Sequence, residues 1–568
     1  MKFKDLPYQR PDIKLFAEQF NLLLNDFNES KSFTDQDLCL KEIYKRRSHF
    51  ETMMNIASTR NSINTSDRFY ETEQRFFDDY EPVYKGLVDL FYKSLLNSKF
   101  RSNLEEKYGI QLLRIAELTL KTFDPSIIDD LKTENQLGTE YTKLIASAKI
   151  QFDNKELNFS ELIPYKQSVD RKIRQSASVV SEGYYSKISN ELRNIFDQLV
   201  KVRHGIAVKL GFSNFIELGY ARMLRTDYDS IMVCDYREKI FTEVVPLVNQ
   251  LKTEQRQRLG LNELYYYDET IDYLDGNALP KGNAEWIVNN ARKMYSELSE
   301  KTGEFMEFMV ENELLDLVTK IDKASGGYCT FFSEYKSPFI FSNFNGTSAD
   351  IDVLTHEAGH AFQGYCSRNL NIEEYYFPTY EACEIHSMSM EFITWPWMNL
   401  FFESETDKYY FSHLSHSLSF LPYGVCVDEF QHWVYENYEA TPDQRDEQWR
   451  VIEKKYLPHR NYDGNNYLEN GGFWHRQSHI FKTPFYYIDY TLAQVCAFQF
   501  WKKSKENLEL AMIDYVRLCE AGGSKSFLQL VKLANLKSPF DSGTVKEIVS
   551  EVNSWLVKNL NSKLTAAE

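Results

Sequence analysis

Residues 354–364 read L-T-H-E-A-G-H-A-F-Q-G and contain the pattern His-Glu-x-x-His at positions 356 to 360. On a helix, His356 and His360 would lie on one face, one turn apart, where both imidazoles can bind a single metal ion. Glu357 would lie beside them and could accept a proton from a metal-bound water without binding the ion. A catalytic zinc site has three protein ligands and one open position. The stretch therefore predicts a helical zinc site whose third ligand comes from elsewhere in the chain.

The residues before this stretch predict the helix that the motif requires. Thr347-Ser348-Ala349-Asp350 matches the S/T-x-x-D/E capping pattern and follows the turn pair Asn345-Gly346. A helix should begin near residue 348 and cover 350–366. Ahead of the turn, two segments rich in aromatic residues predict strands, 327–332 and 336–346. We therefore expect a small sheet beside the metal-binding helix.

The third ligand is expected on a helix that returns to the site. An extended motif with a third histidine is excluded, because Gln363 and Cys366 occupy the positions of its glycine and its last histidine. Residues 379–395 read T-Y-E-A-C-E-I-H-S-M-S-M-E-F-I-T-W and predict a helix. It carries Glu381 and Glu384, and helix geometry alone leaves both possible as the ligand.

Three runs of the chain resemble the thimet oligopeptidase and oligoendopeptidase F family of zinc peptidases, and the oligoendopeptidase F branch in particular. They are H-E-A-G-H-A-F-Q-G-Y, A-C-E-I-H-S and H-I-F-K-T-P-F-Y-Y-I-D-Y. Glu384 lies 28 residues after His356, the spacing typical of the third ligand in that family. The resemblance, which covers about residue 170 to the end, implies that Glu384 binds the ion. It also implies that Glu391 orients a ligand from behind.

The resemblance also implies roles for the third run. The family places a histidine followed by tyrosines here, facing the zinc. His479 and Tyr490 are therefore expected to donate hydrogen bonds to the oxyanion of the transition state, and Tyr486 and Tyr487 to contact substrate. A helix is predicted to begin at Pro484, a favourable first helical residue.

The strand at 337–345 has two possible roles. An exposed strand edge beside the metal-binding helix could pair with an extended peptide through main-chain hydrogen bonds, and Asn343 is the candidate contact on it. A purely structural edge strand explains the same pattern equally well.

Most of the chain has the helical period. Pro82 is expected to kink or divide the first of four amphipathic segments. These segments are 67–97, 137–152, 168–210 and 284–317. The resemblance implies a mainly α, two-lobed fold around a deep central channel. We expect an N-terminal helical region over residues 1–170 and a catalytic region over 171–568.

Composition restricts the partners and the location. A net charge of −18 argues against nucleic acid, because phosphate binding needs clustered Lys and Arg. Eight scattered cysteines without a C-x-x-C pair are typical of a reduced cytosolic protein. The N-terminus has no apolar leader, and no run reaches the ~18 apolar residues that cross a membrane. These features predict a cytoplasmic protein without nucleic-acid or membrane partners, and they do not predict an oligomeric state.

Together, the motifs favour a zinc-dependent endopeptidase that holds one Zn²⁺ per chain and cleaves short oligopeptides, with Glu357 as the general base. A narrow channel would admit short peptides and exclude folded proteins. Two alternatives are a zinc hydrolase of a non-peptide amide and a non-catalytic peptide-binding protein. The last alternative would not need Glu357 in addition to the three ligands.

Overall fold

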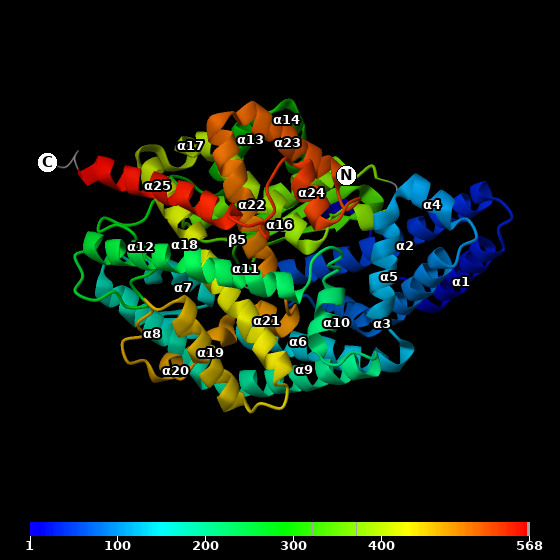
Figure 1. Ribbon diagram of the computed structural model, residues 1–568, viewed down its shortest axis with the longest axis horizontal. Helices are drawn as coiled ribbons and strands as arrows, with labels where there is room; N and C mark the ends of the chain where they lie inside the picture. The colour runs from blue at the N-terminus through cyan, green and yellow to red at the C-terminus, as the bar shows by residue number, and fades with distance from the viewer. Residues whose placement is uncertain (321, 371, 565–568) are drawn as a thin grey trace.

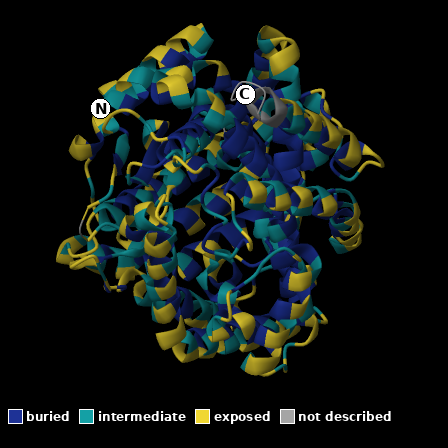
Figure 2. Ribbon diagram, turned by 90° about the vertical axis from the view of Figure 1, so that its left-hand side faces the viewer, coloured by how far each residue is buried: buried dark blue, intermediate teal, exposed yellow. Residues whose placement is uncertain are grey.

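Helices make up most of the computed structural model, which describes residues 1–320, 322–370 and 372–564 (Figure 1). Amphipathic helices such as α1 (Ile13–Glu29) bury one stripe of apolar residues, so they must pack on one another. In Figure 2 the buried residues gather in the interior and the exposed residues on the outward faces. The prediction of a mainly α fold is confirmed.

The N-terminal helices form one end of the molecule, drawn in blue in Figure 1. Phe50 stacks on Tyr84 with ring centroids 4.4 Å apart, and Phe16 packs on Phe50, which joins the first three helices. The first of the amphipathic segments, α3 (Arg68–Leu96), runs unbroken through Pro82, so the proline does not divide it. The helices that follow α1 are α2 (Phe33–Ile63), α3 (Arg68–Leu96), α4 (Arg101–Tyr108), α5 (Ile110–Lys121), α6 (Ile128–Ala146) and α7 (Phe159–Lys166).

The helix predicted over 137–152 is wrong at its C-terminal end. α6 stops at Ala146, and β1 (Ile150–Phe152) pairs antiparallel with β2 (Lys155–Leu157). The two residues between these strands, Asp153 and Asn154, have φ of 51° and 58°. Asp and Asn tolerate the left-handed conformation that a two-residue hairpin needs, so the local turn chemistry outweighs the helical period.

The middle of the chain is again helical. The helices are α8 (Arg171–Lys187), α9 (Ser189–Lys209), α10 (Phe215–Arg222), α11 (Ser230–Glu243), α12 (Val245–Arg258), α13 (Ala284–Leu298) and α14 (Glu300–Glu311). The segment 168–210 is helical as predicted and forms α8 and α9. The segment 284–317 divides at Ser299, whose side chain caps α14, and ends in a strand.

A three-stranded sheet lies beside the helix that carries the motif. Its order is β3 (Leu315–Val318), β5 (Ser337–Phe344), β4 (Tyr328–Phe332), with β5 parallel to β3 and antiparallel to β4. The expectation that 337–345 forms an exposed edge is therefore wrong, because β5 is the central strand and almost all of it is buried. A strand buried on both faces reads as a continuous apolar run, as P-F-I-F does here. The edge on this side of the sheet is β4.

The C-terminal part contributes the remaining core. α15 (Ala349–Ser367) packs on the sheet and on α16 (Tyr380–Ile393), and α16 packs on α22 (Tyr487–Glu506), which also contacts α18 (Thr406–Glu436). In Figure 1, α16, β5 and α22 lie between an upper group that includes α13 and α23 and a lower group that includes α9 and α19. The other helices are α17 (Asn399–Phe402), α19 (Pro442–Tyr456), α20 (Asn466–Glu469), α21 (Ser478–Lys482), α23 (Leu508–Ala521), α24 (Phe527–Leu533) and α25 (Thr544–Leu564).

The predicted start of a helix at Pro484 is wrong by three residues. Phe485 has a φ of 68° and its backbone N–H donates to Gln431 Oε1 at 2.8 Å, so α22 begins only at Tyr487. A non-glycine residue in the left-handed region cannot continue an α-helix. Among the helices of the described residues, none is both long and apolar enough to cross a membrane.

Candidate metal centre

α15 begins where the sequence predicts, but it is held there by a different residue. Ser348 makes no capping hydrogen bond. Instead, the carboxylate of Asp350 accepts the backbone N–H groups of Asn345 and Gly346 at 2.9 and 2.8 Å. A carboxylate in the first turn of a helix is also favoured by the helix dipole. The Asn345-Gly346 turn and the start of α15 are thereby locked together.

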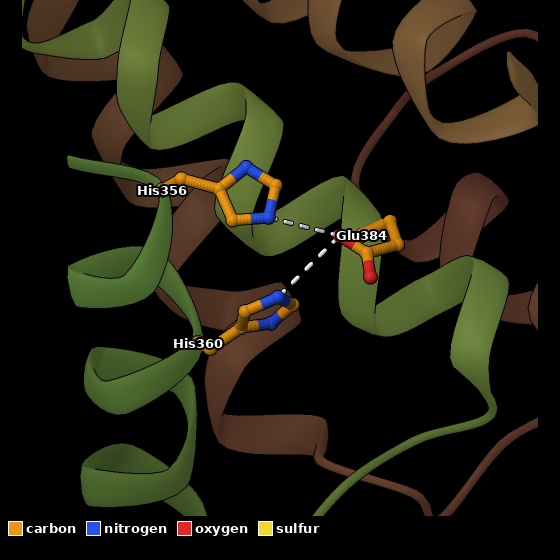
Figure 3. A group of neighbouring side chains, drawn as sticks. All are labelled: His356, His360 and Glu384. Carbon is orange, nitrogen blue, oxygen red and sulfur yellow. Dashed lines mark ion pairs between the residues drawn. The ribbon is translucent and has the colours of Figure 1, made fainter. Parts of the chain in front are cut away.

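Gly359 brings α16 against α15. A Cβ atom at this position would lie 2.6 Å from both the carbonyl oxygen of His386 and the Cα of Ser387. No larger residue fits this contact, because the obstructing atoms belong to the backbone of α16. The crossing places Glu384 opposite the two histidines of α15 (Figure 3).

Three side chains converge on one point, as Figure 3 shows. Glu384 Oε2 lies 3.2 Å from His356 Nε2 and 3.4 Å from His360 Nε2. Ligand atoms held at Zn–ligand distances of 2.0–2.2 Å in a tetrahedron are separated by about 3.4 Å, so this donor set fits zinc in size and in type. Within the described ranges, it is the only group of three His, Cys, Asp or Glu whose ligand atoms all lie within 4.8 Å of one another.

Glu381, the other carboxylate left open by the sequence, lies elsewhere. It is buried, and its Oε1 accepts the hydroxyl of Thr379 at 3.0 Å. Burial and the nearby charge of Asp489 raise its pKa well above the ordinary value, against the influence of Arg225. The structure therefore brings Glu384, and not Glu381, to the histidines.

Glu391 lies behind the site and contacts two histidines. Its Oε1 is 2.7 Å from His356 Nδ1 and its Oε2 is 2.8 Å from His413 Nε2. Beyond it, the indole N–H of Trp395 donates to His413 Nδ1 at 3.0 Å. Burial alone would raise the pKa of Glu391, but the hydrogen bonds from His356 and His413 hold it below its usual value. The sequence indicated Glu391 but gave no signal for His413 or Trp395, which come from other segments.

Glu384 is held on both of its oxygens. The hydroxyl of Ser387 donates to Oε2 at 2.8 Å, and that of Tyr486 donates to Oε1 at 2.5 Å. Tyr486, which the sequence suggested as a substrate contact, therefore hydrogen-bonds to the candidate ligand Glu384. Ser387 is the serine of the A-C-E-I-H-S run, and its direct hydrogen bond to the ligand was not predicted.

Glu357 lies next to the candidate ligands and keeps one carboxylate oxygen free of hydrogen bonds from the described residues. It is 7% exposed, and its Oε2 has no hydrogen-bond partner within the described part of the chain. Burial raises its pKa, and the charges of His356 and His360 act in the opposite direction. Gly327 approaches it closely, since a Cβ there would be 3.6 Å from Glu357 Oε1. A buried carboxylate with a raised pKa next to a metal site is suited to proton transfer.

His479 and Tyr490 form a pair beside the candidate centre. His479 Nε2 lies 3.3 Å from the Tyr490 hydroxyl, and Gln477 Nε2 donates to His479 Nδ1 at 2.8 Å. Burial lowers the pKa of His479 to about 4, so the ring is neutral near pH 7. Because Gln477 donates to Nδ1, the proton of the ring lies on Nε2. Burial raises the pKa of Tyr490 well above its ordinary value, so its hydroxyl keeps its proton. Both groups are therefore hydrogen-bond donors. Tyr487 packs edge-on against the His479 ring.

The remaining predicted contact, Asn343, faces the loop before β4. Its Nδ2 donates to the carbonyl oxygens of Ala324 and Gly326, each at 2.8 Å. These hydrogen bonds order the residues that lead to Gly327 and to the edge strand.

A cavity of about 420 Å³ adjoins these groups. His479, Tyr490, Tyr487 and Glu391 line it, whereas the three candidate ligands lie alongside and do not. Its other walls come from the first turn of α15, from α16 and from α18. The expected oxyanion donors His479 and Tyr490 and the carboxylate of Glu391 therefore border the same cavity.

Known families match nearly the whole chain. Residues 164–550 match the family described as Peptidase family M3, and residues 3–123 match the Peptidase M3 N-terminal domain. A curated relative, the oligoendopeptidase F homolog of Borreliella burgdorferi (strain B31), is 25% identical over 416 residues, which cover 69% of this chain and 68% of the relative.

Solved structures match over almost their full length. PZ peptidase A, solved with an inhibitor, is 54% identical and has a TM-score of 0.97, covering 98% of this chain and 99% of that one. A protein from Bacillus anthracis (strain Ames), provisionally described as oligoendopeptidase F, is 52% identical with a TM-score of 0.93 and covers 98% of each chain.

Proposed function

The chain belongs to peptidase family M3, as a metalloendopeptidase similar to oligoendopeptidase F, and on that premise we propose that it is a zinc enzyme that cleaves internal bonds of short peptides. The observation that carries the proposal is the convergence of His356 Nε2, His360 Nε2 and Glu384 Oε2 on one point, with Glu357 beside it. Two imidazoles and one carboxylate with an open fourth position are the ligand set of catalytic zinc in peptidases. Bound zinc would lower the pKa of a water molecule to about 7 and polarise the carbonyl that is attacked.

In this proposal, the residues of the chain move one proton and stabilise one charge. Glu357 accepts the proton of the attacking water and then passes it to the nitrogen of the leaving amine. Its buried, unpartnered Oε2 and raised pKa support this role. Tyr490 and His479 donate hydrogen bonds to the oxyanion that forms at the attacked carbonyl. Tyr486 and Ser387 keep Glu384 in place, so Tyr486 acts through the metal ligand rather than directly on substrate.

The peptide would be held by β4 rather than by β5. β4 is the edge strand, and the residues before it pass next to Glu357. An extended peptide can add to such an edge through main-chain hydrogen bonds, which do not depend on its sequence. Part of the outer side of β4 is already used, because Asn55 of α2 donates to the carbonyl of Phe331 at 3.0 Å. The peptide would therefore pair near Gly327 and Tyr328. The deep channel, the division of the chain near residue 170 and a cytoplasmic location stay predictions.

Replacing Glu357 tests the mechanism. The Glu357→Gln variant should bind zinc normally, because Glu357 is not a ligand, but should lose activity by about 10³-fold or more, as when a main catalytic group is removed. The measurement compares metal content and cleavage of internally quenched peptides of graded length. Glu217→Gln, on the exposed face of α10, is the matched control and should behave as wild type. Wild-type rates of Glu357→Gln would rule out the general-base role. Activity on small amides but not on peptides would rule out an endopeptidase.

A further inference from the structure

The cavity beside the candidate centre has a polar end. Gln494 lies on α22, one turn beyond Tyr490, and is only 2% exposed. Its Nε2 is buried and has no hydrogen-bond partner in the part of the chain that the structure describes, and the residue is one of those that line the cavity. A buried amide N–H without a partner is unfavourable unless water or a ligand satisfies it. Since the side chain borders an open space, a ligand can reach it.

An acceptor borders the same cavity. Asp352, one turn before His356 on α15, borders the cavity. Its Oδ1 accepts the hydroxyl of Tyr409 at 2.7 Å. Its oxygens keep acceptor capacity whether or not the carboxyl group is ionised, so this single hydrogen bond leaves room for another donor. The cavity therefore offers both a donor and an acceptor.

Part of the remaining lining suits an apolar stem. Met388 lies one turn after Glu384 on α16, and Phe420 of α18 packs edge-on against Tyr487 of α22 with ring centroids 5.7 Å apart. These three side chains supply apolar surface to the cavity. Because His479 and Tyr490 also border the cavity, a peptide whose scissile carbonyl meets these two donors places a neighbouring side chain here.

We propose that this cavity is a subsite for glutamine at a position flanking the cleaved bond, with Gln494 and Asp352 as its specificity-determining residues. The carboxamide oxygen of the substrate accepts from Gln494 Nε2, and its NH₂ group donates to Asp352. An amide pairs with an amide whichever way the Gln494 side chain is turned. The inference rests on the proposed peptidase function and names its preferred substrate class.

Other side chains fit this cavity less well. Lysine and arginine have no acceptor for the Gln494 N–H. Glutamate in its ionised form has no N–H to donate to Asp352 and no neutral amide to pair with Gln494. Methionine has nearly the shape of glutamine, but it would displace water from the cavity without replacing the hydrogen bonds of that water. A site built to bind a polar group rejects an analogue that lacks it.

The test compares peptides that differ at one residue. Internally quenched peptides carry Gln, Met, Lys or Glu at each of the two positions flanking the cleaved bond, and kcat/KM is measured for the zinc-loaded, full-length enzyme. At one of the two positions we expect Gln to exceed Met by about 10-fold, the value of a satisfied buried hydrogen bond. The Gln494→Leu variant should reduce that ratio to about 1, and Gln494→Glu should raise the rate for Lys relative to Gln.

Gln499→Leu is the matched control, on the same helix. Gln499 faces away from the cavity and exchanges hydrogen bonds with the main chain of Lys537 at 3.0 and 2.9 Å. Its substitution should leave the Gln-to-Met ratio unchanged. Equal rates for Gln and Met in the wild type, at both positions, would overturn the subsite and leave the peptidase function standing, and this result needs no variant to fold. The absence of cleavage of every peptide by zinc-loaded enzyme would overturn both.

Discussion

A single carboxylate determines which nitrogen of His356 is free for the ion. The Trp395 indole can only donate, so His413 Nδ1 must accept and the proton of that ring lies on Nε2. That proton points to Glu391 Oε2, and the other oxygen of Glu391 accepts from His356 Nδ1–H. In the neutral ring, Nε2 is then the nitrogen without a proton, and it is the one directed at the metal position. Such outer partners fix both the tautomer and the orientation of a ligand.

Removing Glu391 should therefore weaken metal binding. We expect Glu391→Ala to lower zinc affinity by about 10- to 100-fold, because His356 loses the group that fixes its tautomer. Competition with a chromogenic chelator measures this affinity. Glu381→Gln is the control on the same helix and should keep its zinc, since Glu381 contacts Thr379 rather than the site. Wild-type affinity in Glu391→Ala would contradict the role given to this residue.

At the scale of the element, the site depends on one helix crossing. A glycine inside a helix costs about 1 kcal/mol of helix propensity, so Gly359 in the middle of the motif already indicated that another segment packs closely there. That segment is α16, whose backbone at His386 and Ser387 fills the place of the missing side chain. The contact sets the distance between Glu384 and the histidines of α15.

Adding one methyl group at this crossing should separate the two helices. We expect Gly359→Ala to lower the free energy of unfolding by about 1–3 kcal/mol, the usual cost of overpacking, although alanine is the better helix former. Gly205→Ala in α9 is the matched control. A Cβ at Gly205 meets no heavy atom within 4 Å, so alanine should stabilise by up to about 1 kcal/mol. Thermal unfolding and zinc content measure both variants. A Gly359→Ala variant that is as stable as wild type and binds zinc normally would show that α15 and α16 can move apart at little cost.

The sequence predicted the elements that carry local signals, and it missed those set by distant contacts. The helix at 349–367 and the helix at 380–393 follow from a turn, a period and a motif, and both are present. The position of 337–344 in the centre of the sheet depends on β3, a short strand that the helical period of 284–317 conceals. His413 and Trp395 could not be predicted, because nothing in α18 or in the turn after α16 indicates that they meet Glu391.

At the scale of the whole molecule, half-buried histidines join segments far apart in the chain. His459, in the loop after α19, has its Nδ1 3.2 Å from Asn249 Oδ1 of α12. Burial lowers the pKa of His459 to about 4, as it does for His479. In the unfolded chain such a ring titrates near pH 6.5. Between these two values the unfolded state binds a proton that the folded state does not.

Stability should consequently fall as the pH drops from about 6.5 to about 4. Each of these rings contributes stability that is complete above its unfolded pKa and is lost on acidification, by up to about 3 kcal/mol. Melting temperatures across this range measure the effect, and His459→Gln should flatten the dependence. His49→Gln, on the exposed surface of α2, is the control for replacing a histidine by glutamine. A His459→Gln variant as acid-sensitive as wild type would contradict this account.

The order of the parts along the chain also has a consequence for biosynthesis. The first candidate ligand is residue 356 and the donor pair is completed only at Tyr490, so the N-terminal helices leave the ribosome long before any catalytic set exists. At about 5–20 residues per second, the interval before Tyr490 is added is roughly half a minute or more. During that time the growing chain contains no working protease. A growing chain therefore lacks the complete catalytic set until Tyr490 has been added.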